Sequence, residues 1–339
     1  MAQHFLLSAV VRDISPLEIA RLSVEAAWKI LYESRWGLSG TQCCPACGVN
    51  RKHYFIKSRK QWRCAEKYCG HTFSVTSRTT FAYHKKSLPD ILYGVAKFIT
   101  AVEGESALRM SYDMGIAHKS AFVFNHKLRE AIYKTLDLTP LKGEVEMDGC
   151  YFHYYVRPKN KHKYRVDRRL RSNMNPNKRA TFVMRQRGEP GQGAIRTIVE
   201  VIKAENERDV GALVRKYVAP GSTIFADEHP CYAALATQYH VRQVNHAEEY
   251  SSDDGTNQNQ AESFFNRERR LFARIHKCAP KYLKFYANEI AWREDNRRKT
   301  FKWLFEDLLK KCLSVVQSKF WSKYWHGNHL MEDTLFAAG

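Results

Sequence analysis

The period of the hydrophobic pattern changes along the chain. Residues 15 to 35 have apolar positions three and four apart, which predicts a packing helix that begins near Ser15 and Pro16. After Pro140, short alternating or apolar runs bounded by turn residues predict strands. These strands are expected at 144–155, in two parts, and at 181–185, 195–202, 223–226 and 241–244. Helices are expected at 209–216, 232–239, along the stripe from Ala261 to Ile275, and at 280–296.

Residues 87 to 135 have the spacing of three helices, and the second of them ends at Gly115. A short helix, a glycine turn and a basic helix are typical of a helix-turn-helix that binds DNA. An ordinary helical hairpin with a solvated basic face fits the same pattern. The basic side chains that could reach phosphates or base edges are Lys119, His126, Lys127 and Arg129.

Two cysteine pairs, Cys44 with Cys47 and Cys64 with Cys69, have the spacing of a tetrahedral structural zinc site. Residues 54–56 and 61–63 between the pairs predict a hairpin, and residues 72–75 predict a third strand. The segment is therefore predicted to be a zinc ribbon with one Zn²⁺. Four thiolates leave no open catalytic position, so the ribbon is expected to grip DNA or protein. The neighbouring Cys43 and His71 remain alternative ligands.

Three acids stand where the predicted strands and a predicted helix would place them at one edge of a sheet. Asp148 lies in a strand, Asp227 ends the next buried strand, and Glu262 follows one turn into an amphipathic helix. This order suits a mixed α/β sheet flanked by helices, as in the ribonuclease H-like fold. Carboxylates are hard oxygen ligands that suit Mg²⁺ or Mn²⁺. Two such ions about 4 Å apart can activate the attacking oxygen and stabilise the leaving oxygen of a phosphodiester.

Each acid also has a simpler interpretation. Asp148 could belong to a solvated acidic row that starts at Glu144, and Asp227 could cap the helix that follows it. Glu262 could form a capping box with Asn259, which is compatible with catalysis because a cap would fix the carboxylate. The rival acids are Glu146, Glu228, Glu248, Asp253 and Asp254.

Charge narrows the class of partner. The 339 residues carry a formal net charge of +20, which favours a polyanion such as nucleic acid, although a ribosomal or membrane-surface protein could share it. Residues 157–187 alone hold twelve Lys or Arg and one acid, so this segment is either solvated or a DNA-facing loop. We expect no membrane span and no signal peptide. Nine cysteines, four of them in a metal pattern, favour a reducing cytosol over a disulfide framework.

The chain resembles the prokaryotic insertion-sequence transposases that have an N-terminal zinc ribbon and a DDE catalytic domain. The resemblance covers roughly residues 15 to 300. Its most specific part is the helix motif that joins Glu262 to the Phe264–Phe265 pair and the Arg269–Arg270 pair. The other matching pieces are Trp36-Gly37, Cys44-Pro45-x-Cys47-Gly48, Arg63-Cys64 to Cys69, Phe73-Ser74-Val75 with Thr79-Thr80-Phe81, Glu146-x-Asp148-x-x-Tyr151, Asp227 with Tyr232, and Asn257-x-Asn259. The chain departs from the family in the longer gap of its second cysteine pair, in Phe152-His153-Tyr154 where glycines are common, in segment 157–187 and in the tail beyond 300.

The resemblance implies a transposase whose metal-binding and catalytic triad is Asp148, Asp227 and Glu262, with two Mg²⁺ or Mn²⁺ ions per active site. It would cut at the terminal inverted repeats of a mobile element and join the 3′-hydroxyl ends to target DNA. It would act in the cytoplasm, associated with the nucleoid, as a homodimer or larger assembly on double-stranded DNA. The expected DNA contacts are Lys119, His126, Lys127, Arg129, Arg168, Arg169, Arg269 and Arg270. A DNA-binding regulator without catalysis and a metal-dependent nuclease without joining activity remain alternatives.

These patterns divide the chain into five expected parts. They are an N-terminal helical segment (1–40), the zinc ribbon (41–82), a helix-turn-helix domain (83–138), a ribonuclease H-like catalytic domain (139–300) and a helical tail (301–339). The aromatic residues of the tail are expected to pack on the domain or a sister subunit, and stacking on nucleic acid is the alternative.

Overall fold

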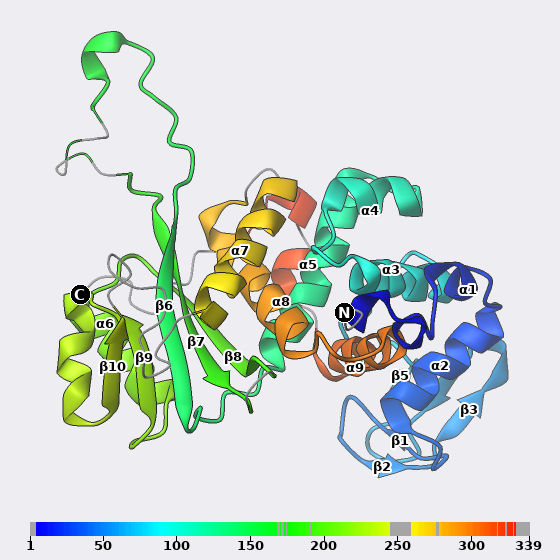
Figure 1. Cartoon of the computed structure of the whole chain (residues 1–339). Helices are drawn as coiled ribbons and strands as arrows, with labels where there is room; N and C mark the ends of the chain where they lie inside the picture. Colours follow the sequence, from blue (N-terminus) through cyan, green and yellow to red (C-terminus); the bar gives the residue numbers. More distant parts are fainter. Residues whose placement is uncertain are drawn as a thin grey trace. The chain divides into compact units, whose positions relative to one another are not determined.

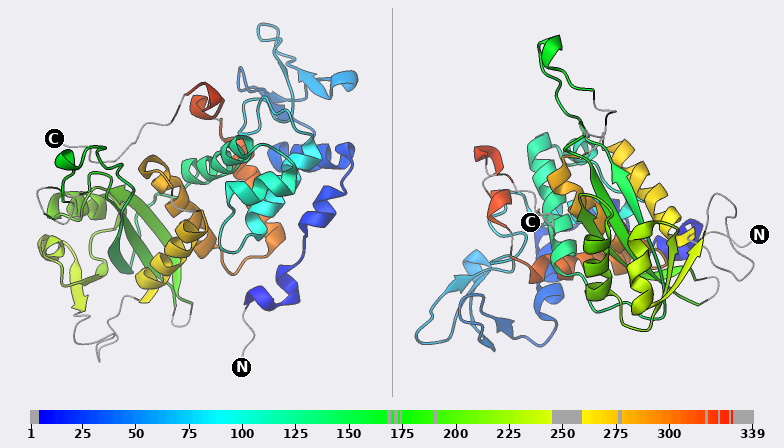
Figure 2. Two further views of the ribbon diagram at one scale, coloured as in Figure 1. Left: turned by 90° about the horizontal axis from the view of Figure 1, so that it is seen from above. Right: turned by 90° about the vertical axis from the view of Figure 1, so that its left-hand side faces the viewer.

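The computed structural model of the chain is drawn in Figure 1, and Figure 2 gives two further views. It describes residues 5–167, 170, 173, 175–189, 192–244, 259–275, 278–316, 318–322, 324–327 and 329. The chain forms two compact units. Unit 1 combines Met1–Leu136 with Arg298–His329, and unit 2 is built from Asp137–Arg297.

The N-terminal part of unit 1 begins with two short 3-10 turns, η1 (Phe5–Leu7) and η2 (Ala9–Val11). The single helix expected at 15–35 is two helices, α1 (Pro16–Ala20) and α2 (Val24–Trp36). Ser15 and Glu18 form a reciprocal capping box at the start of α1, as the serine–proline pair suggests. The second helix starts because the Ser23 hydroxyl accepts a hydrogen bond from the Ala26 backbone N–H, which is a new N-cap.

The predicted ribbon strands are present. β3 (Tyr54–Ile56), β4 (Gln61–Arg63) and β5 (Thr72–Phe73) form an antiparallel sheet, and the short strands β1 (Gln42–Cys43) and β2 (Asn50–Arg51) pair beside it. The turn between β3 and β4 contains a 3-10 segment, η3 (Lys57–Arg59). Helix α2 packs its aromatic side on this sheet, where the Trp28 and Trp62 rings stack at 5.6 Å. This stacking makes α2 part of the ribbon's small core.

Three helices follow the ribbon, as predicted. They are α3 (Leu88–Thr100), α4 (Ala107–Met114) and α5 (His118–Lys134). Gly115 adopts a left-handed conformation at the end of α4, which a residue with a side chain rarely takes, so the chain turns sharply into α5. Segment 107–134 is therefore a short helix, a glycine turn and a longer helix.

The tail of unit 1 contains α9 (Phe301–Ser314), α10 (Lys319–Ser322) and η8 (Tyr324–His326). Helix α9 packs against α2, α3 and α5. The buried Trp321 indole donates a hydrogen bond to Glu130 of α5 at 2.8 Å. Trp321 therefore packs on its own unit, whereas Trp325 is exposed.

Unit 2 is organised around one mixed five-stranded sheet with the spatial order β10-β9-β6-β7-β8. Its strands are β6 (Glu144–Phe152), β7 (Arg179–Arg187), β8 (Ala194–Ile202), β9 (Thr223–Asp227) and β10 (His240–Val244). The first three form an antiparallel meander, β9 lies parallel to β6, and β10 lies parallel to β9. This confirms the mixed α/β class for unit 2.

Helices cover both faces of this sheet. α6 (Glu207–Tyr217) and the 3-10 segment η6 (Pro230–Thr237) pack on the face that carries Val145 and Met147. α7 (Asn259–Arg274), η7 (Pro280–Tyr282) and α8 (Leu283–Asp295) belong to the other side, where Glu146 contacts the start of α7. Alternate residues of a strand point to opposite faces of the sheet. On each strand, one set of alternate residues therefore faces α6 and the other set faces α7 and α8.

Two expectations about secondary structure need correction. The segment at 232–239 is a 3-10 helix and not an α-helix. The segment expected to hold two strands at 144–155 is one strand that ends at Phe152, after which the chain leaves the sheet before returning at Arg179. Within the described residues, no helix has the length and apolar character required to cross a membrane.

Candidate functional site

The four predicted cysteine ligands come together in unit 1. The sulfur atoms of Cys44, Cys47, Cys64 and Cys69 all lie within 4.8 Å of one another. The Cys44–Cys69 and Cys47–Cys64 sulfur separations are 3.8 and 3.7 Å. A tetrahedral zinc with Zn–S bonds of about 2.3 Å requires sulfur separations of about 3.8 Å, so the cluster has the dimensions of a structural Zn²⁺ site.

The backbone around the cysteines supports the same conclusion. The Gly48 N–H donates to the Cys44 carbonyl oxygen at 2.9 Å and closes the first knuckle. The Glu66 N–H points to the Cys64 sulfur at 3.4 Å, as amides do toward thiolate ligands. The alternative ligands are not in the cluster: Cys43 and His71 are both exposed.

Asp148 and Asp227 lie on two adjacent parallel strands of unit 2. The ladder between β6 and β9 pairs Glu144 with Thr223, Val145 with Ile224 and Glu146 with Phe225. The same register continued by two residues would set Asp148, in the middle of β6, level with Asp227, the last residue of β9, on strands about 5 Å apart. Asp148 is two residues after Glu146, and Asp227 is two residues after Phe225. Since every second residue of a strand faces the same side, both carboxylates belong to the face that α7 covers.

Glu146 ties α7 to this face of the sheet. Its carboxylate accepts hydrogen bonds from the backbone N–H groups of Gln260 and Ala261 at 2.8 and 3.2 Å, and it pairs with Arg187 at 2.7 Å. Burial raises the pKa of Glu146, whereas the Arg187 charge lowers it. A carboxylate at a helix N-terminus satisfies free N–H groups and favours the helix dipole. The Glu146 carboxylate is thus engaged in holding the start of α7. This distinguishes Glu146 from the other rival acids. It also shows that the acidic row is not simply solvated.

Glu262 follows directly after the anchored N–H groups of α7. It is exposed, whereas Ala261, Phe264 and Phe265 are buried against the unit. Further along α7, the Arg269 guanidinium lies 3.4 Å from the Cys150 sulfur of β6. Contacts to Glu146 and Cys150 thus hold α7 on both sides of Asp148 along β6, and Glu262 lies near the Glu146 end.

Asp148, Asp227 and Glu262 do not form a compact group. Within the described part of the chain, only the four cysteines bring three or more potential ligand atoms within 4.8 Å of one another. Asp227 accepts a hydrogen bond from the His229 N–H at 3.2 Å, which fixes the turn after β9. The carboxylates themselves are hard oxygen donors that suit Mg²⁺ or Mn²⁺. Asp148 and Asp227 lie on neighbouring strands and Glu262 lies in the first turn of α7, and all three offer carboxylate ligands.

A fourth acid at this edge, Glu205, was not among the predicted residues. Its carboxylate accepts a hydrogen bond from the Tyr232 hydroxyl at 3.4 Å, and its backbone N–H donates to the Tyr151 hydroxyl at 2.9 Å. Burial, followed by the charge of Asp227, raises the pKa of Glu205 to about 7. Burial and the charges of Glu205, Asp148 and Asp227 also raise the pKa of Tyr232. The only sequence signal for Glu205 is its position between β8 and the N-cap Asn206, which does not predict proximity to Asp148.

Glu268 is a fully buried acid on α7. The Thr181 hydroxyl donates to one carboxylate oxygen at 2.9 Å. Burial raises its pKa to about 8. A buried carboxyl with this pKa is largely protonated at neutral pH, which reduces the cost of placing it in the core.

The predicted DNA contacts fall into three groups. Lys119, Arg269 and Arg270 are exposed, and Lys127 is half-buried. Arg168 and Arg169 lie outside the described residues. His126 and Arg129 are buried at 0% and 1% exposure, so the expectation that they reach phosphates is wrong for this structure.

His126 and Arg129 are enclosed by residues from other segments of unit 1. The His126 ring stacks on Trp321 at 5.2 Å. The Arg129 guanidinium donates to the Glu105 carbonyl oxygen at 2.9 Å and lies over the Phe98 ring. Helical spacing alone could not reveal this, because the covering Trp321 comes from the far tail of the chain.

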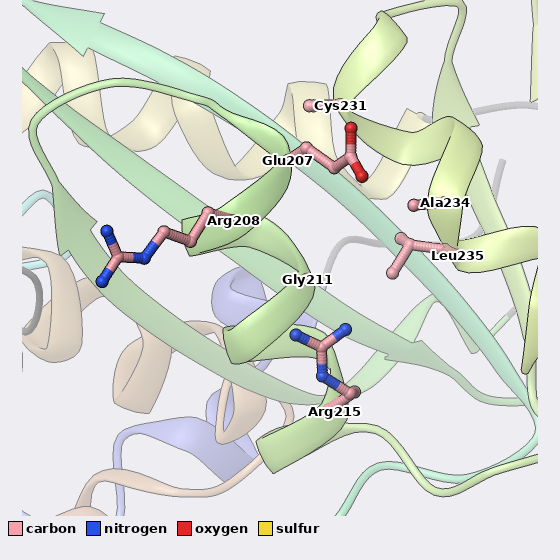
Figure 3. Close-up of a pocket in the computed structure, with 7 residues that line it drawn as sticks. All are labelled: Glu207, Arg208, Gly211, Arg215, Cys231, Ala234 and Leu235. Carbon is pink, nitrogen blue, oxygen red and sulfur yellow. The ribbon is translucent and has the colours of Figure 1, made fainter.

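A pocket of about 360 Å³ lies in unit 2 between α6 and η6 (Figure 3). It is lined by Glu207, Arg208, Gly211, Arg215, Cys231, Ala234 and Leu235. This pocket is on the α6 side of the sheet, whereas the strand alternation puts Asp148 and Asp227 on the α7 side. It is therefore separate from the candidate metal site.

The chain matches two protein-family models. Residues 140–295 match the ISXO2-like transposase domain, and residues 22–72 match the transposase zinc-ribbon domain. The two matches together support an insertion-sequence transposase with an N-terminal zinc ribbon. Within that class, its second domain is of the ISXO2-like type. Searches of curated proteins and of solved structures gave no match.

The matched ranges coincide with structural boundaries. The ISXO2-like match lies inside Asp137–Arg297 and includes the whole five-stranded sheet. The zinc-ribbon match starts just before α2, the helix whose Trp28 stacks on the ribbon. Helix α2 is therefore part of the ribbon module both in family terms and in packing.

Proposed function

We propose that this chain is an active DDE transposase whose unit 2 has a ribonuclease H-like fold. The strand order β10-β9-β6-β7-β8, with β6 and β9 parallel at the centre, supports this assignment. The observation that carries the proposal is the shared level of Asp148 and Asp227 beside the anchored N-terminus of α7. In this proposal, acids from two strands and one helix meet at one edge of the sheet.

In this proposal Asp148, Asp227 and Glu262 hold two divalent metal ions, Mg²⁺ or Mn²⁺. When bound, the ions supply positive charge at the scissile phosphodiester and help to generate the attacking oxygen nucleophile. Glu146 keeps Glu262 in place by fixing the first turn of α7. Arg269 and Arg270, exposed on the same helix, contact the phosphates on either side of the reacting one.

The reaction has two displacement steps at phosphorus. Water first attacks at the end of the mobile element and breaks the bond between phosphorus and the 3′ oxygen, which leaves a 3′-hydroxyl. That hydroxyl then attacks a phosphodiester of the target, forms a new phosphorus–oxygen bond and releases a target 3′-hydroxyl. No high-energy cofactor is needed, because each step exchanges one phosphodiester bond for another or hydrolyses it.

The zinc ribbon and segment 107–134 of unit 1 recognise the terminal inverted repeats in this proposal. Lys119 is exposed at the start of α5, where a recognition helix would present its first residues to the major groove. The joining of two ends requires at least two copies of the chain, so we expect a homodimer or larger assembly on DNA in the cytoplasm. The high positive charge predicts that binding weakens steeply with salt.

A cleavage assay with an uncut element end, together with a strand-transfer assay with a pre-cut end and a supercoiled target, tests this proposal. Wild-type protein with Mg²⁺ or Mn²⁺ should give joined product. Asp148→Ala should abolish both cleavage and joining but retain binding of the end. The matched control is Glu144→Gln, which changes an exposed acid on the same face of β6 and should keep activity.

Three outcomes separate the alternatives. Cleavage without joined product would identify a nuclease. End binding without either reaction in the wild type would identify a non-catalytic regulator. Loss of end binding in Asp148→Ala would show that Asp148 has a structural role instead of the proposed one.

A further inference from the structure

The chain leaves the sheet of unit 2 between β6 and β7 as a long excursion. The last pair of the β6–β7 ladder is Phe152 with Arg179, and residues 153–178 lie beyond it. We call the described residues of this segment (153–167, 170, 173 and 175–178) the basic arm. Figure 1 shows it extending away from the ends of β6 and β7, with the 3-10 turn η4 (His162–Tyr164) at its tip. An excursion of this length without a core of its own is uncommon in a compact domain and usually functional.

The root of the basic arm is held in a defined shape. The Asn175 side-chain amide donates to the Tyr154 carbonyl oxygen at 2.6 Å, and the Asn177 amide donates to the Tyr155 carbonyl oxygen at 3.3 Å. Tyr154 is buried, and its hydroxyl lies 3.8 Å from the Cys278 sulfur. These contacts continue the connection between the two sides of the arm past the end of the ladder.

The outer part of the arm is exposed and strongly basic. Every second residue from Arg157 to Arg165 is Lys or Arg, and positions 156–166 contain no acid. All the residues from 157 to 167 are exposed. Arg165 closes the tip by donating to the carbonyl oxygens of Lys159 and Asn160 at 3.0 and 3.3 Å. Within the described residues, no carboxylate pairs with Arg157, Lys159, Lys161 or Lys163, so these charges are free to meet an external anion.

Aromatic side chains accompany the charges. Tyr155 is 78% exposed and Tyr164 is 56% exposed. The Lys163 ammonium lies 5.1 Å from the Tyr164 ring. A charged loop that serves only solubility needs no exposed tyrosines, whereas interleaved basic and aromatic residues are the combination that contacts phosphates and stacks on unpaired bases.

The arm leaves the sheet from the end of β6 that lies beyond Asp148. Asp148 precedes Phe152 by four residues, a rise of about 13 Å along the strand. β9 runs parallel to β6, so its last residue, Asp227, points to the same end of the sheet. DNA held at Asp148 and Asp227 would therefore pass the root of the arm.

We propose that the basic arm grips the DNA that flanks the scissile phosphate. Lys159, Lys161 and Lys163 neutralise backbone phosphates, and Tyr155 and Tyr164 stack on bases that are unpaired at the cut. This inference rests on the proposed function for the identity of the DNA. It adds a DNA contact outside the zinc ribbon, segment 107–134 and helix α7, located on the sheet that carries the acids.

The test uses full-length protein and compares two triple variants with equal loss of charge. The arm variant is Lys159→Gln, Lys161→Gln, Lys163→Gln. The control is Lys203→Gln, Arg208→Gln, Lys216→Gln, which changes three exposed residues at or near α6 in the same unit. The readout is the slope of log affinity for element-end DNA against log salt. Loss of three phosphate contacts should make the slope less steep by about 2 to 3. The control variant should have the slope of the wild type.

A second pair of measurements locates the contact. A hydroxyl-radical footprint of the arm variant should lose protection next to the cut and keep it over the rest of the end. Tyr155→Ala with Tyr164→Ala should weaken binding of an end with unpaired bases at the cut by about tenfold or more relative to a fully paired end. A paired-to-unpaired ratio equal to that of the wild type would overturn the stacking role.

The proposal is overturned if the arm variant has the salt slope and footprint of the wild type. It is also overturned if the slope is kept while the protein–DNA complex contains fewer copies of the chain, because the arm would then be a subunit contact. If the arm variant gives either result while the wild type still cleaves and joins, the transposase assignment is unaffected. A wild type that binds ends with the expected salt dependence but performs no reaction would contradict only the proposed function.

Discussion

Gly149 and Glu205 fit together at the edge of the sheet that carries Asp148. Gly149 has no side chain, and a Cβ atom at its position would overlap the Glu205 carboxylate. Glu205 therefore occupies the space beside β6 that a side chain at 149 would fill. The Tyr232 hydroxyl donates to this carboxylate at 3.4 Å. The absence of a side chain at one position is thus what admits an acid from a distant segment to the neighbourhood of the candidate site.

Gly149→Ala should therefore displace the Glu205 carboxylate, the flexible end of its side chain, and lower stability by at most about 1 kcal/mol, the lower end of the cost of overpacking. The measurement is thermal or denaturant unfolding of the single and double variants. Glu205→Ala should remove the overlap, so Gly149→Ala should cost much less when it is combined with Glu205→Ala. Equal costs of Gly149→Ala in the two backgrounds would show that the two residues are not coupled.

The register of β9 against β6 makes a separate prediction about Asp227. Asp227→Asn should reduce cleavage by on the order of 10³-fold or more and leave end binding nearly unchanged, because a neutral amide is a poor ligand for Mg²⁺ or Mn²⁺. Its neighbour Glu228 is exposed and follows the end of the strand. Glu228→Gln should keep most of the activity. If the Glu228 variant were inactive and the Asp227 variant active, the register argument would assign the wrong acid.

Glu268 predicts how the stability of unit 2 depends on pH. Burial raises its pKa to about 8, so the folded protein binds this proton more tightly than the unfolded chain does. The associated stability is fully present at low pH and is lost as pH rises toward 8. Glu268→Gln has no such proton to lose and can still accept the Thr181 hydrogen bond.

The difference in unfolding free energy between Glu268→Gln and wild type should grow between pH 5 and 8 by at most about 1.4 kcal/mol per pH unit. Above the folded pKa it should level off. Thermal melts across this range provide the measurement. Glu207→Gln, a change of an exposed acid on α6, is the control and should show no comparable trend. A difference that is flat with pH would argue that Glu268 titrates normally.

The zinc ribbon should unfold when its metal is removed, because so small a sheet depends on the ion. Cys47→Ser should lower bound zinc well below one ion per chain, whereas Cys43→Ser should retain it. The stacked Trp28 and Trp62 lie in the ribbon core, so tryptophan fluorescence should shift in the Cys47 variant and on chelation. Zinc loss in the Cys43 variant would place that thiol in the ligand set.

Local patterns were sufficient where one short segment contains the whole feature. The four cysteine ligands, the ribbon strands, the three helices from Leu88 to Lys134 and the Ser15 cap all follow from nearby residues. The two-residue alternation of strands also placed the mixed sheet. These features were predictable because metal spacing, caps and periodicity act over a few residues.

Burial was harder to predict from local patterns. His126 and Arg129 read as exposed basic residues, yet Trp321 and the Glu105 carbonyl enclose them. Glu146 read as a rival ligand, yet it anchors the start of α7. Each of these outcomes depends on a partner far away in the chain, which no window of sequence contains.

The sequence by itself determined the zinc ligands, the order of helices and strands, and the family resemblance, because these depend on residue type and short spacing. The tertiary structure alone decided that Asp148 and Asp227 lie on parallel neighbouring strands that point to one edge of the sheet and that Glu205 lies beside Gly149. It also decided that the basic arm leaves the sheet at that edge. The physical reason is that strand register and side-chain burial arise from long-range packing, whereas propensity and spacing are local.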